Sequence, residues 1–293
     1  MSHSAQTKLT HKPVDPMPPQ PPMHEVKAKM KATWEDGNYA SFAKYMENGA
    51  IEILENWGLP KCQRLLDVGC GSGQSAIPAA QQGHNVVGID IAENLIDHAN
   101  ARAEEEKLSV IFEVADAEAL PYEDADFDTV ISMIGAMFAP QPSKVVSEMA
   151  RVLRPGGKLC MANWTADSMP AQMFKCVAGI IPPPPGFISP ILWGDETTVI
   201  ERLSPFFSDI ELTRKIYPQW HYPFSIDGIV DLFKTHFGPI KRAFDQLEED
   251  WEETENLRQR LFDIYKNNCQ ISPDEITTIT GGEYLEIIAT RRN

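Results

Sequence analysis

The glycine-rich segment Leu66–Gly73 holds the residues whose types and spacing most directly suggest chemistry. Asp67 closes an apolar run, and three glycines follow at alternate positions: Gly69, Gly71 and Gly73. Glycine reaches backbone angles closed to other residues and lets peptide groups lie flat against a ligand. Residues 64–68 read as a buried strand and residues 74–82 as the helix that follows. The turn between them therefore predicts a small-molecule site at a helix N-terminus.

The spacing of these glycines separates two classes of cofactor. A dinucleotide-binding loop follows the pattern G-x-G-x-x-G, but its third glycine position falls on Gln74. A carboxylate two residues before Gly69 is also a poor neighbour for a pyrophosphate, whereas it suits a ligand that presents an ammonium group. We therefore expect a cofactor that carries an amino acid, with Asp67 facing its amine.

Four further segments follow in series: Asn85–Ile91, Val114–Pro121, Phe127–Ser132 and Arg151–Gly157. In the first of them Asp90 ends the expected strand, 17 residues after Gly73, and Ile91 follows it. A carboxylate at that strand end points into the crevice where open α/β sheets bind ligands, and its two oxygens can accept both hydroxyls of a ribose. Ile91 beside it can pack on the face of an adenine. Nicotinamide enzymes share such an acid, so Asp90 alone does not discriminate between cofactors.

Together the five segments resemble the class I S-adenosylmethionine-dependent methyltransferases. The resemblance is closest to the ubiquinone/menaquinone-biosynthesis-like group (methyltransferase type 11). The matching pieces stand in the family's order across roughly residues 34–165, and the family's tail pattern returns at the C-terminus. One glycine motif would be weak support, whereas five motifs in series are specific.

The resemblance implies S-adenosyl-L-methionine as the cofactor and assigns roles to the ends of two more strands. Asp116 would accept a hydrogen bond from the adenine amino group, and the Ala117 N–H would meet a ring nitrogen. Ser132 and Met133 would form the lip between the cofactor pocket and the acceptor cavity. Asp116 has a second reading, as the cap of a following turn.

Residues 24–57 are expected to form helices. In enzymes of the resembled family this segment folds over the cofactor, which would place Tyr39 and Phe42 near its methionine end. The two rings are three residues apart, so they could instead share an apolar helix face, and both readings stay open. The predicted cofactor contacts are Tyr39, Asp67, Gly69, Gly71, Gly73, Gln74, Asp90, Ile91, Asp116, Ala117, Ser132 and Met133.

Strand and helix patterns alternate along the chain, which predicts an α/β fold with a doubly wound, mostly parallel sheet. Strands are expected over 64–68, 85–91, 109–115, 127–133, 157–164 and 209–217, and helices over 74–82, 93–107, 143–153 and 195–203. Pro155–Gly157 is expected to stop a helix after Arg154. The resemblance implies that a last strand, 284–291, inserts antiparallel between two others and completes a seven-stranded sheet.

We expect four parts: a disordered, proline-rich tail (1–23), N-terminal helices over the cofactor (24–57), the methyltransferase core (58–218 and 283–293) and a helical lid (219–282). Helices are expected in the lid over 227–236 and 242–266. Because this insertion joins two strands of the core, it must fold back over the sheet edge where the acceptor would lie. Its aromatic residues would suit an apolar pocket or form the lid's own small core.

The expected chemistry is an in-line attack on a methyl group carried by a sulfonium, for which the protein supplies alignment and a dry cavity. His221 and His236 of the lid are weak candidates for a general base, since a lone histidine is more often structural. The apolar segment 132–138 follows the fourth strand where an Asn-Pro-Pro-Tyr signature would indicate methylation of an amino nitrogen. We therefore favour a small, apolar or aromatic acceptor that is methylated on oxygen or carbon.

The charge and the residue composition exclude several kinds of partner. The formal net charge is −16, with 42 acidic against 26 basic residues, which argues against nucleic acid and against an anionic membrane surface as partner. No apolar run is long enough to span a bilayer, and the first 25 residues hold no apolar signal core, so we expect a cytoplasmic protein. The five cysteines have neither zinc nor redox spacing, and no metal-binding carboxylate set is evident.

The residues are also compatible with two other functions. A nicotinamide-dependent oxidoreductase would bind NAD in the same crevice, although Asp67 and Gln74 disfavour it. A non-catalytic, regulatory member of the fold would keep the same cofactor residues. The identity of the acceptor and the oligomeric state are not predicted.

Overall fold

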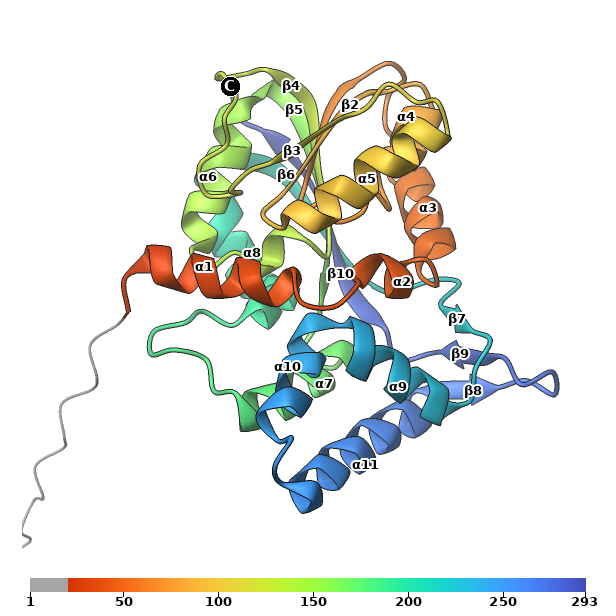
Figure 1. Cartoon of the computed structure of the whole chain (residues 1–293). Coiled ribbons are helices and arrows are strands. Elements are labelled where there is room, and N and C mark those ends of the chain that lie inside the picture. The colour runs from red at the N-terminus through yellow and green to blue at the C-terminus, as the bar shows by residue number, and fades with distance from the viewer. Residues whose placement is uncertain (1–20) are drawn as a thin grey trace, which may run out of the picture.

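The computed structural model describes residues 21–293, and a single large sheet organises them (Figure 1). Of the predicted tail, residues 1–20 lie outside the described part, and Met23 already begins the first helix. The described part contains no helix with the length and apolar character that a membrane crossing requires.

The sheet has seven strands in the order β3-β2-β1-β4-β5-β10-β6. β10 runs antiparallel to both β5 and β6, while the other pairs are parallel. The predicted mostly parallel, doubly wound sheet is therefore confirmed. Its strands are β1 (Arg64–Val68), β2 (Asn85–Asp90), β3 (Ile111–Val114), β4 (Phe127–Met133), β5 (Leu153–Trp164), β6 (Phe207–Ile216) and β10 (Glu283–Arg291).

The order of the strands fixes where a ligand can bind. From β1 the chain winds outward through β2 to β3, and it then returns to place β4 on the other side of β1. The connections after β1 and β4 therefore leave in opposite directions and open a crevice at the carboxyl ends of these strands. Leu65, Leu66 and Val68 of β1 are fully buried, as the central strand of a parallel sheet covered on both faces requires.

Helices flank the sheet and close one of its ends. α4 (Ala76–Gln81) and α5 (Glu93–Glu105) lie on one side, and α6 (Pro142–Val152) and α8 (Glu196–Leu203) on the other (Figure 1). α1 (Met23–Trp34) and α2 (Tyr39–Ala43) cross the end of the sheet, with α3 (Glu47–Asn56) beside α4. Beyond them lie α7 (Met169–Ile180), α9 (Ile226–His236), α10 (Gly238–Gln246) and α11 (Trp251–Asn267). Two short 3-10 turns are η1 (Ala136–Phe138) and η2 (Pro190–Gly194).

Three predictions of elements were inaccurate. α6 ends at Val152 because Leu153 is drawn into the core and pairs with Phe127, so β5 already contains the Pro-Gly-Gly segment as an irregularity. The predicted helix 242–266 is two helices, since the Asp250 carboxylate caps a new one by accepting from the Glu253 N–H. The insertion also contains a small sheet of β7 (His221–Tyr222), β9 (Thr277–Ile279) and β8 (Cys269–Ile271).

A close approach of two glycines joins the loop after β1 to the loop after β4. A Cβ on Gly135 would lie 2.3 Å from the carbonyl oxygen of Gly69 and 2.8 Å from its Cα. Ile134 just before it has a φ of +56°, an unfavourable angle for a branched side chain, and its N–H donates to the Ala162 carbonyl at 2.8 Å. The glycine loop and the end of β4 thus form one packed unit.

Gly135→Ala should lower the free energy of unfolding by ~1–3 kcal/mol, because the added methyl group overlaps the backbone of Gly69. Urea denaturation measures the loss. Gly179→Ala is the control, since a Cβ there meets open space on a helix and should be neutral or stabilising. Equal stability of the two variants would show that the loops are not packed as described.

Candidate active site

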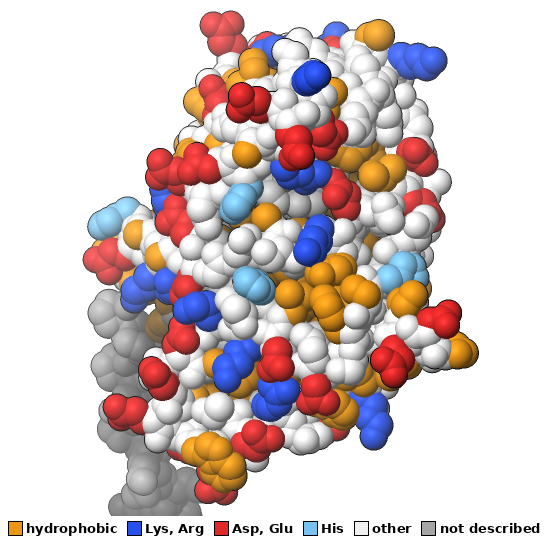
Figure 2. Space-filling view, turned by 45° about the vertical axis from the view of Figure 1, so that its right-hand side comes forward, with side chains coloured by type: hydrophobic (Ala, Val, Ile, Leu, Met, Phe, Trp, Pro, Cys, Tyr) orange, Lys and Arg blue, Asp and Glu red, His pale blue; other side chains and the backbone are white. Residues whose placement is uncertain are grey.

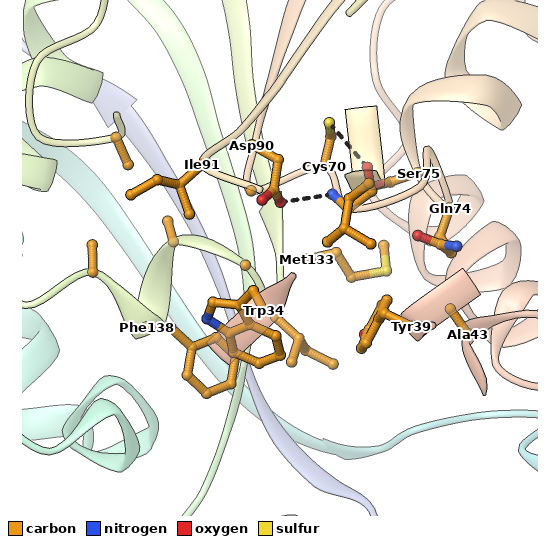
Figure 3. A pocket seen from close by; sticks show the side chains of 18 of the residues that line it. Trp34, Tyr39, Ala43, Cys70, Gln74, Ser75, Asp90, Ile91, Met133 and Phe138 are labelled. Atoms are coloured by element: carbon orange, nitrogen blue, oxygen red, sulfur yellow. Dashed lines mark hydrogen bonds between the residues drawn. The ribbon is translucent and has the colours of Figure 1, made fainter. Parts of the chain in front are cut away.

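A cavity lies at the carboxyl ends of the central strands, under α1 and α2 (Figure 3). Figure 3 shows Asp90 and Ile91 on one side of it, Trp34, Tyr39 and Phe138 on the other, and Met133 between them. The cavity therefore has a polar end at the strand tips and an aromatic end beneath the helices.

The polar end is organised by Asp90, the last residue of β2. Its Oδ2 accepts from the Gly71 N–H at 3.0 Å, drawn as a dashed line in Figure 3, and its Oδ1 accepts from the Ala92 N–H at 2.9 Å. Gly71 has a φ of +54°, a conformation that glycine adopts without strain. Burial raises the pKa of Asp90, which the backbone N–H donors counter. The carboxylate thus holds the glycine loop while its remaining lone pairs face the cavity.

Asp67 is not where the sequence argument placed it. Its side chain is fully buried and does not line the cavity, because it turns under the loop toward the start of α4. There Oδ2 accepts from the Ser75 hydroxyl at 2.6 Å, whereas Oδ1 has no partner among the described residues. Burial raises the pKa of Asp67 to about 7. Ser75, not Asp67, reaches the cavity wall.

Asp116 lies at the polar end and has two kinds of partner. Its Oδ1 accepts from the Glu118 N–H at 2.9 Å, the turn contact that the alternative reading expected. Its Oδ2 lies 2.5 Å from the Lys27 Nζ of α1, which also lies 2.5 Å from Glu118 Oε2. Burial lowers the pKa of Lys27, but the hydrogen bonds to both carboxylates outweigh this and raise it overall. Nothing in the sequence signalled this ion pair, since its partners are far apart in the chain.

The aromatic end is built from elements distant in sequence. Trp34 of α1 lies 4.9 Å from Phe138 and 5.9 Å from Phe237, measured between ring centroids. Phe42 of α2 packs against Phe237 at 5.6 Å. Tyr39 meets both Trp34 and Phe42. Tyr39 and Phe42 thus line the cavity and also share an apolar cluster, so the two readings of this pair do not exclude one another.

Most of the predicted cofactor residues line this one cavity: Tyr39, Gly69, Gly71, Gln74, Asp90, Ile91, Asp116, Ala117 and Met133. Besides Asp67, two others lie behind its wall. Gly73 packs against Ile77 and Phe112. Ser132 is fully buried, donates to the Val68 carbonyl at 2.7 Å and accepts from the Ala136 N–H.

Neither predicted base candidate lies in the cavity. His221 is exposed on β7, where its Nδ1 lies 2.9 Å from Thr278 Oγ1. His236 ends α9 and is half-buried outside the lining, with its carbonyl accepting from the Asn38 N–H. Within residues 21–293, no group of three His, Cys, Asp or Glu side chains could hold a metal ion.

Comparison with known proteins decides the family. Residues 66–161 match the profile of the family described as "Methyltransferase domain". An uncharacterized protein of Mycobacterium tuberculosis is 33% identical over 240 residues, which cover 78% of this chain and 87% of the relative. The 27-O-demethylrifamycin SV methyltransferase of Amycolatopsis mediterranei is 42% identical over 113 residues, 38% of this chain and 42% of that one.

The chain belongs to the class I S-adenosylmethionine-dependent methyltransferases. Its cofactor is S-adenosyl-L-methionine. The fold is also that of the phosphoethanolamine N-methyltransferase 2 of Haemonchus contortus, solved with S-adenosyl-L-methionine (TM-score 0.53, 23% identity, 84% of this chain and 53% of that one). These comparisons give no support to the oxidoreductase alternative.

Ionisation of the buried Asp67 side chain should make the stability of the folded methyltransferase depend on pH. Its pKa is about 7 in the folded protein against 3.8 for an unperturbed group, so the folded state keeps a proton that the unfolded state releases across this window. The free energy of unfolding therefore falls as the pH rises from about 4 to about 7.

Asp67→Asn cannot ionise, so its stability relative to the wild type should increase by roughly 2–4 kcal/mol across the same window. Urea unfolding at several pH values measures this difference. Asp97→Asn, at an exposed carboxylate of α5, should show no such trend. If the difference in unfolding free energy between Asp67→Asn and the wild type did not change with pH, the Asp67 carboxylate would have to be hydrated.

Lys27→Met should loosen α1, which contains no fully buried residue and is tied to Asp116 and Glu118 by the Lys27 ion pairs. Loss of about 1 kcal/mol would speed hydrogen exchange of α1 amides roughly fivefold and leave the sheet unchanged. Mass spectrometry of peptides from residues 23–34 reads the rate. Lys29→Met on the exposed face of the same helix is the control, and equal exchange in both variants would show that the Lys27 ion pairs do not hold α1.

Proposed function

We propose that this enzyme transfers the methyl group of S-adenosyl-L-methionine to a small, apolar or aromatic acceptor, on oxygen or carbon. The observation that carries the proposal is the division of one cavity into a polar end with two carboxylates and an end walled by aromatic rings. A reaction that joins a polar cofactor to an apolar acceptor needs both surfaces within one enclosure.

The residues of the polar end fit the cofactor. Asp90 would accept the ribose hydroxyls, Ile91 would pack on the adenine, and Asp116 with the Ala117 N–H would meet its edge. The glycine loop leaves room for a ligand beside Gly71, which has no side chain. A Cβ there would project into the cavity, 3.2 Å from Gln74 Oε1 and 3.8 Å from Tyr39. Gly69 and Gln74 of this end, Met133 between the two ends and Tyr39 of the aromatic end would surround the methionine portion.

The buried acceptor atom of Asp67 also fits. Its Oδ1 lies beneath the loop without a partner, and a bound ammonium group above Ser75 would lower the free energy of the ionised carboxylate. We therefore assign Asp67 a positioning role that acts through Ser75, and Ser132 and Gly73 a role in holding the wall.

When bound, the cofactor supplies a methyl group on a sulfonium that is ready for in-line displacement. The chain's own part is to hold two reactants in line and to exclude water. The rings of Trp34, Phe138 and Phe237 would orient the acceptor opposite Met133 and keep the chamber dry. Arg242 ties the insertion to the N-terminal segment through Asp36 and the Ala32 carbonyl, so we propose that residues 24–57 and 219–282 together form the cover.

Charge argues for a small molecule over nucleic acid. The chain carries 42 acidic and 26 basic residues. On the face in Figure 2, Lys and Arg side chains are scattered among Asp and Glu side chains rather than gathered into one area. A nucleic-acid backbone requires a concentrated basic surface. The name of the rifamycin relative agrees with oxygen as the acceptor atom, although that match covers less than half of either chain.

Turnover tests the proposal. The enzyme is incubated with cofactor bearing a deuterated methyl group and with a metabolite extract, and products are analysed by mass spectrometry. Label should appear in small, apolar molecules as a methyl ether or a C-methyl group. Label found only in nucleic acid, in protein or on amines would contradict it.

Asp90→Asn should weaken binding of S-adenosylhomocysteine roughly 10- to 100-fold, because the ribose loses hydrogen bonds to a charged acceptor. Isothermal titration calorimetry measures the affinity. Asp97→Asn removes a carboxylate outside the cavity and should bind as the wild type does. Unchanged binding by Asp90→Asn would remove this residue from the site.

A further inference from the structure

The charged side chains that line the cavity are confined to its polar end. Among the described residues they are Lys27, Asp90 and Asp116. Lys27 and Asp116 pair with each other, and Asp90 accepts from two backbone N–H groups. Each of these groups therefore already has a partner at the strand tips, away from the aromatic wall.

The polar atoms along the aromatic wall cannot take up a proton near neutral pH. The Tyr217 hydroxyl donates to the Met46 carbonyl at 2.9 Å, and the Trp220 indole donates to the Tyr222 hydroxyl at 2.8 Å. Burial, followed by the charge of Asp90, raises the pKa of Tyr39, so its phenol stays protonated. The described lining of this end thus offers aromatic rings but no general base.

We infer that the acceptor is a phenol that enters the cavity already ionised, so that the substrate and not the protein provides the deprotonated oxygen. The inference rests on the proposed function and deepens it. It follows from the chamber itself: an oxygen nucleophile that is methylated where no side chain can accept its proton must lose that proton first.

The charges and electrons balance in this scheme. The phenol releases its proton to solvent before it binds, and the phenolate then lies opposite the positive sulfonium. An oxygen lone pair forms the new C–O bond as the C–S bond breaks, and the pair of that bond stays on sulfur. A phenolate and a sulfonium become a neutral ether and a neutral thioether, so the reacting pair carries no net charge before or after the transfer.

The aromatic side chains that line the cavity also suit the ring of a phenol. Rings from separate elements surround the space: Trp34 from α1, Phe138 from η1, Phe174 from α7 and Phe237 after α9. Phe138 lies 5.6 Å from Phe174, which lies 6.4 Å from Phe237. Aromatic side chains pack on a flat ring by edge and face contacts, whereas they offer little to a polar chain.

A spectroscopic titration tests the inference without turnover. 4-Nitrophenol changes its visible absorption on ionisation, so its spectrum reports the protonation state of the bound molecule. The protein is loaded with sinefungin, which carries an ammonium group near the sulfonium position, or with neutral S-adenosylhomocysteine. Bound 4-nitrophenol should be the phenolate with sinefungin, and its apparent pKa should be higher with S-adenosylhomocysteine. A bound, protonated phenol in the sinefungin complex, or no binding, would overturn the inference.

Methyl transfer gives the second readout. The probes are 4-nitrophenol, 4-chlorophenol and 4-methylphenol, with 4-methylbenzyl alcohol as a control of similar shape that does not ionise. The rising limb of kcat/KM against pH should move with the pKa of each phenol, and the alcohol should react at least ~100-fold more slowly. A limb at one fixed pH for all phenols, or comparable turnover of the alcohol, would reveal a protein base.

The double variant His221→Ala/His236→Ala is the matched control, since both histidines lie outside the cavity. For every phenol, the rising part of the plot of kcat/KM against pH should stay where it is in the wild type. Its loss for any phenol would overturn the inference. If the protein binds S-adenosylhomocysteine but methylates none of the phenols, the inference fails while the proposed function stands. If it does not bind S-adenosylhomocysteine, the proposed function itself fails.

Discussion

The site depends on one interaction, the hydrogen bond from the Gly71 N–H to the Asp90 carboxylate at the end of β2. It joins the loop after β1 to the tip of the neighbouring strand, while Ala92 holds the second carboxylate oxygen from the start of the next connection. The loop keeps its left-handed glycine angles because this bond and the contact of Gly69 with Gly135 fix it from two sides. The loop, the acid and the end of β4 therefore form one pre-organised surface.

A second constraint is the separation of charge within the cavity. Carboxylates stand at the strand tips, and rings stand under the helices. The topology produces this separation, because the carboxyl ends of parallel strands meet at one edge, whereas α1 and α2 cross that edge and α9 lies beyond them (Figure 1). The ends of strands can carry polar side chains, because they lie at the edge of the buried sheet. The helices that close the cavity need apolar side chains, because burial of apolar surface holds them in place. Under the proposed function, cofactor and acceptor would meet where the two surfaces face each other.

Local signals in the sequence were sufficient for the sheet and for most of the residues at the polar end of the cavity. Strand patterns, the glycine spacing and acids at strand ends act over a few residues, so Asp90 and Asp116 were predicted at their observed places. The remainder depends on contacts between distant segments. The turn of Asp67 toward Ser75, the Lys27–Asp116 ion pair and the wall from Trp34 to Phe174 are set by tertiary packing, which no local pattern records. The strands of the small sheet were too short to show a period.

The most direct test of this account is a crystal structure of the protein with S-adenosylhomocysteine. Both ribose hydroxyls should lie within hydrogen-bond distance of the Asp90 carboxylate, with Gly71 still bonded to it and the sulfur directed toward the aromatic wall. A cofactor bound away from the tip of β2, or a glycine loop that has left Asp90, would contradict it.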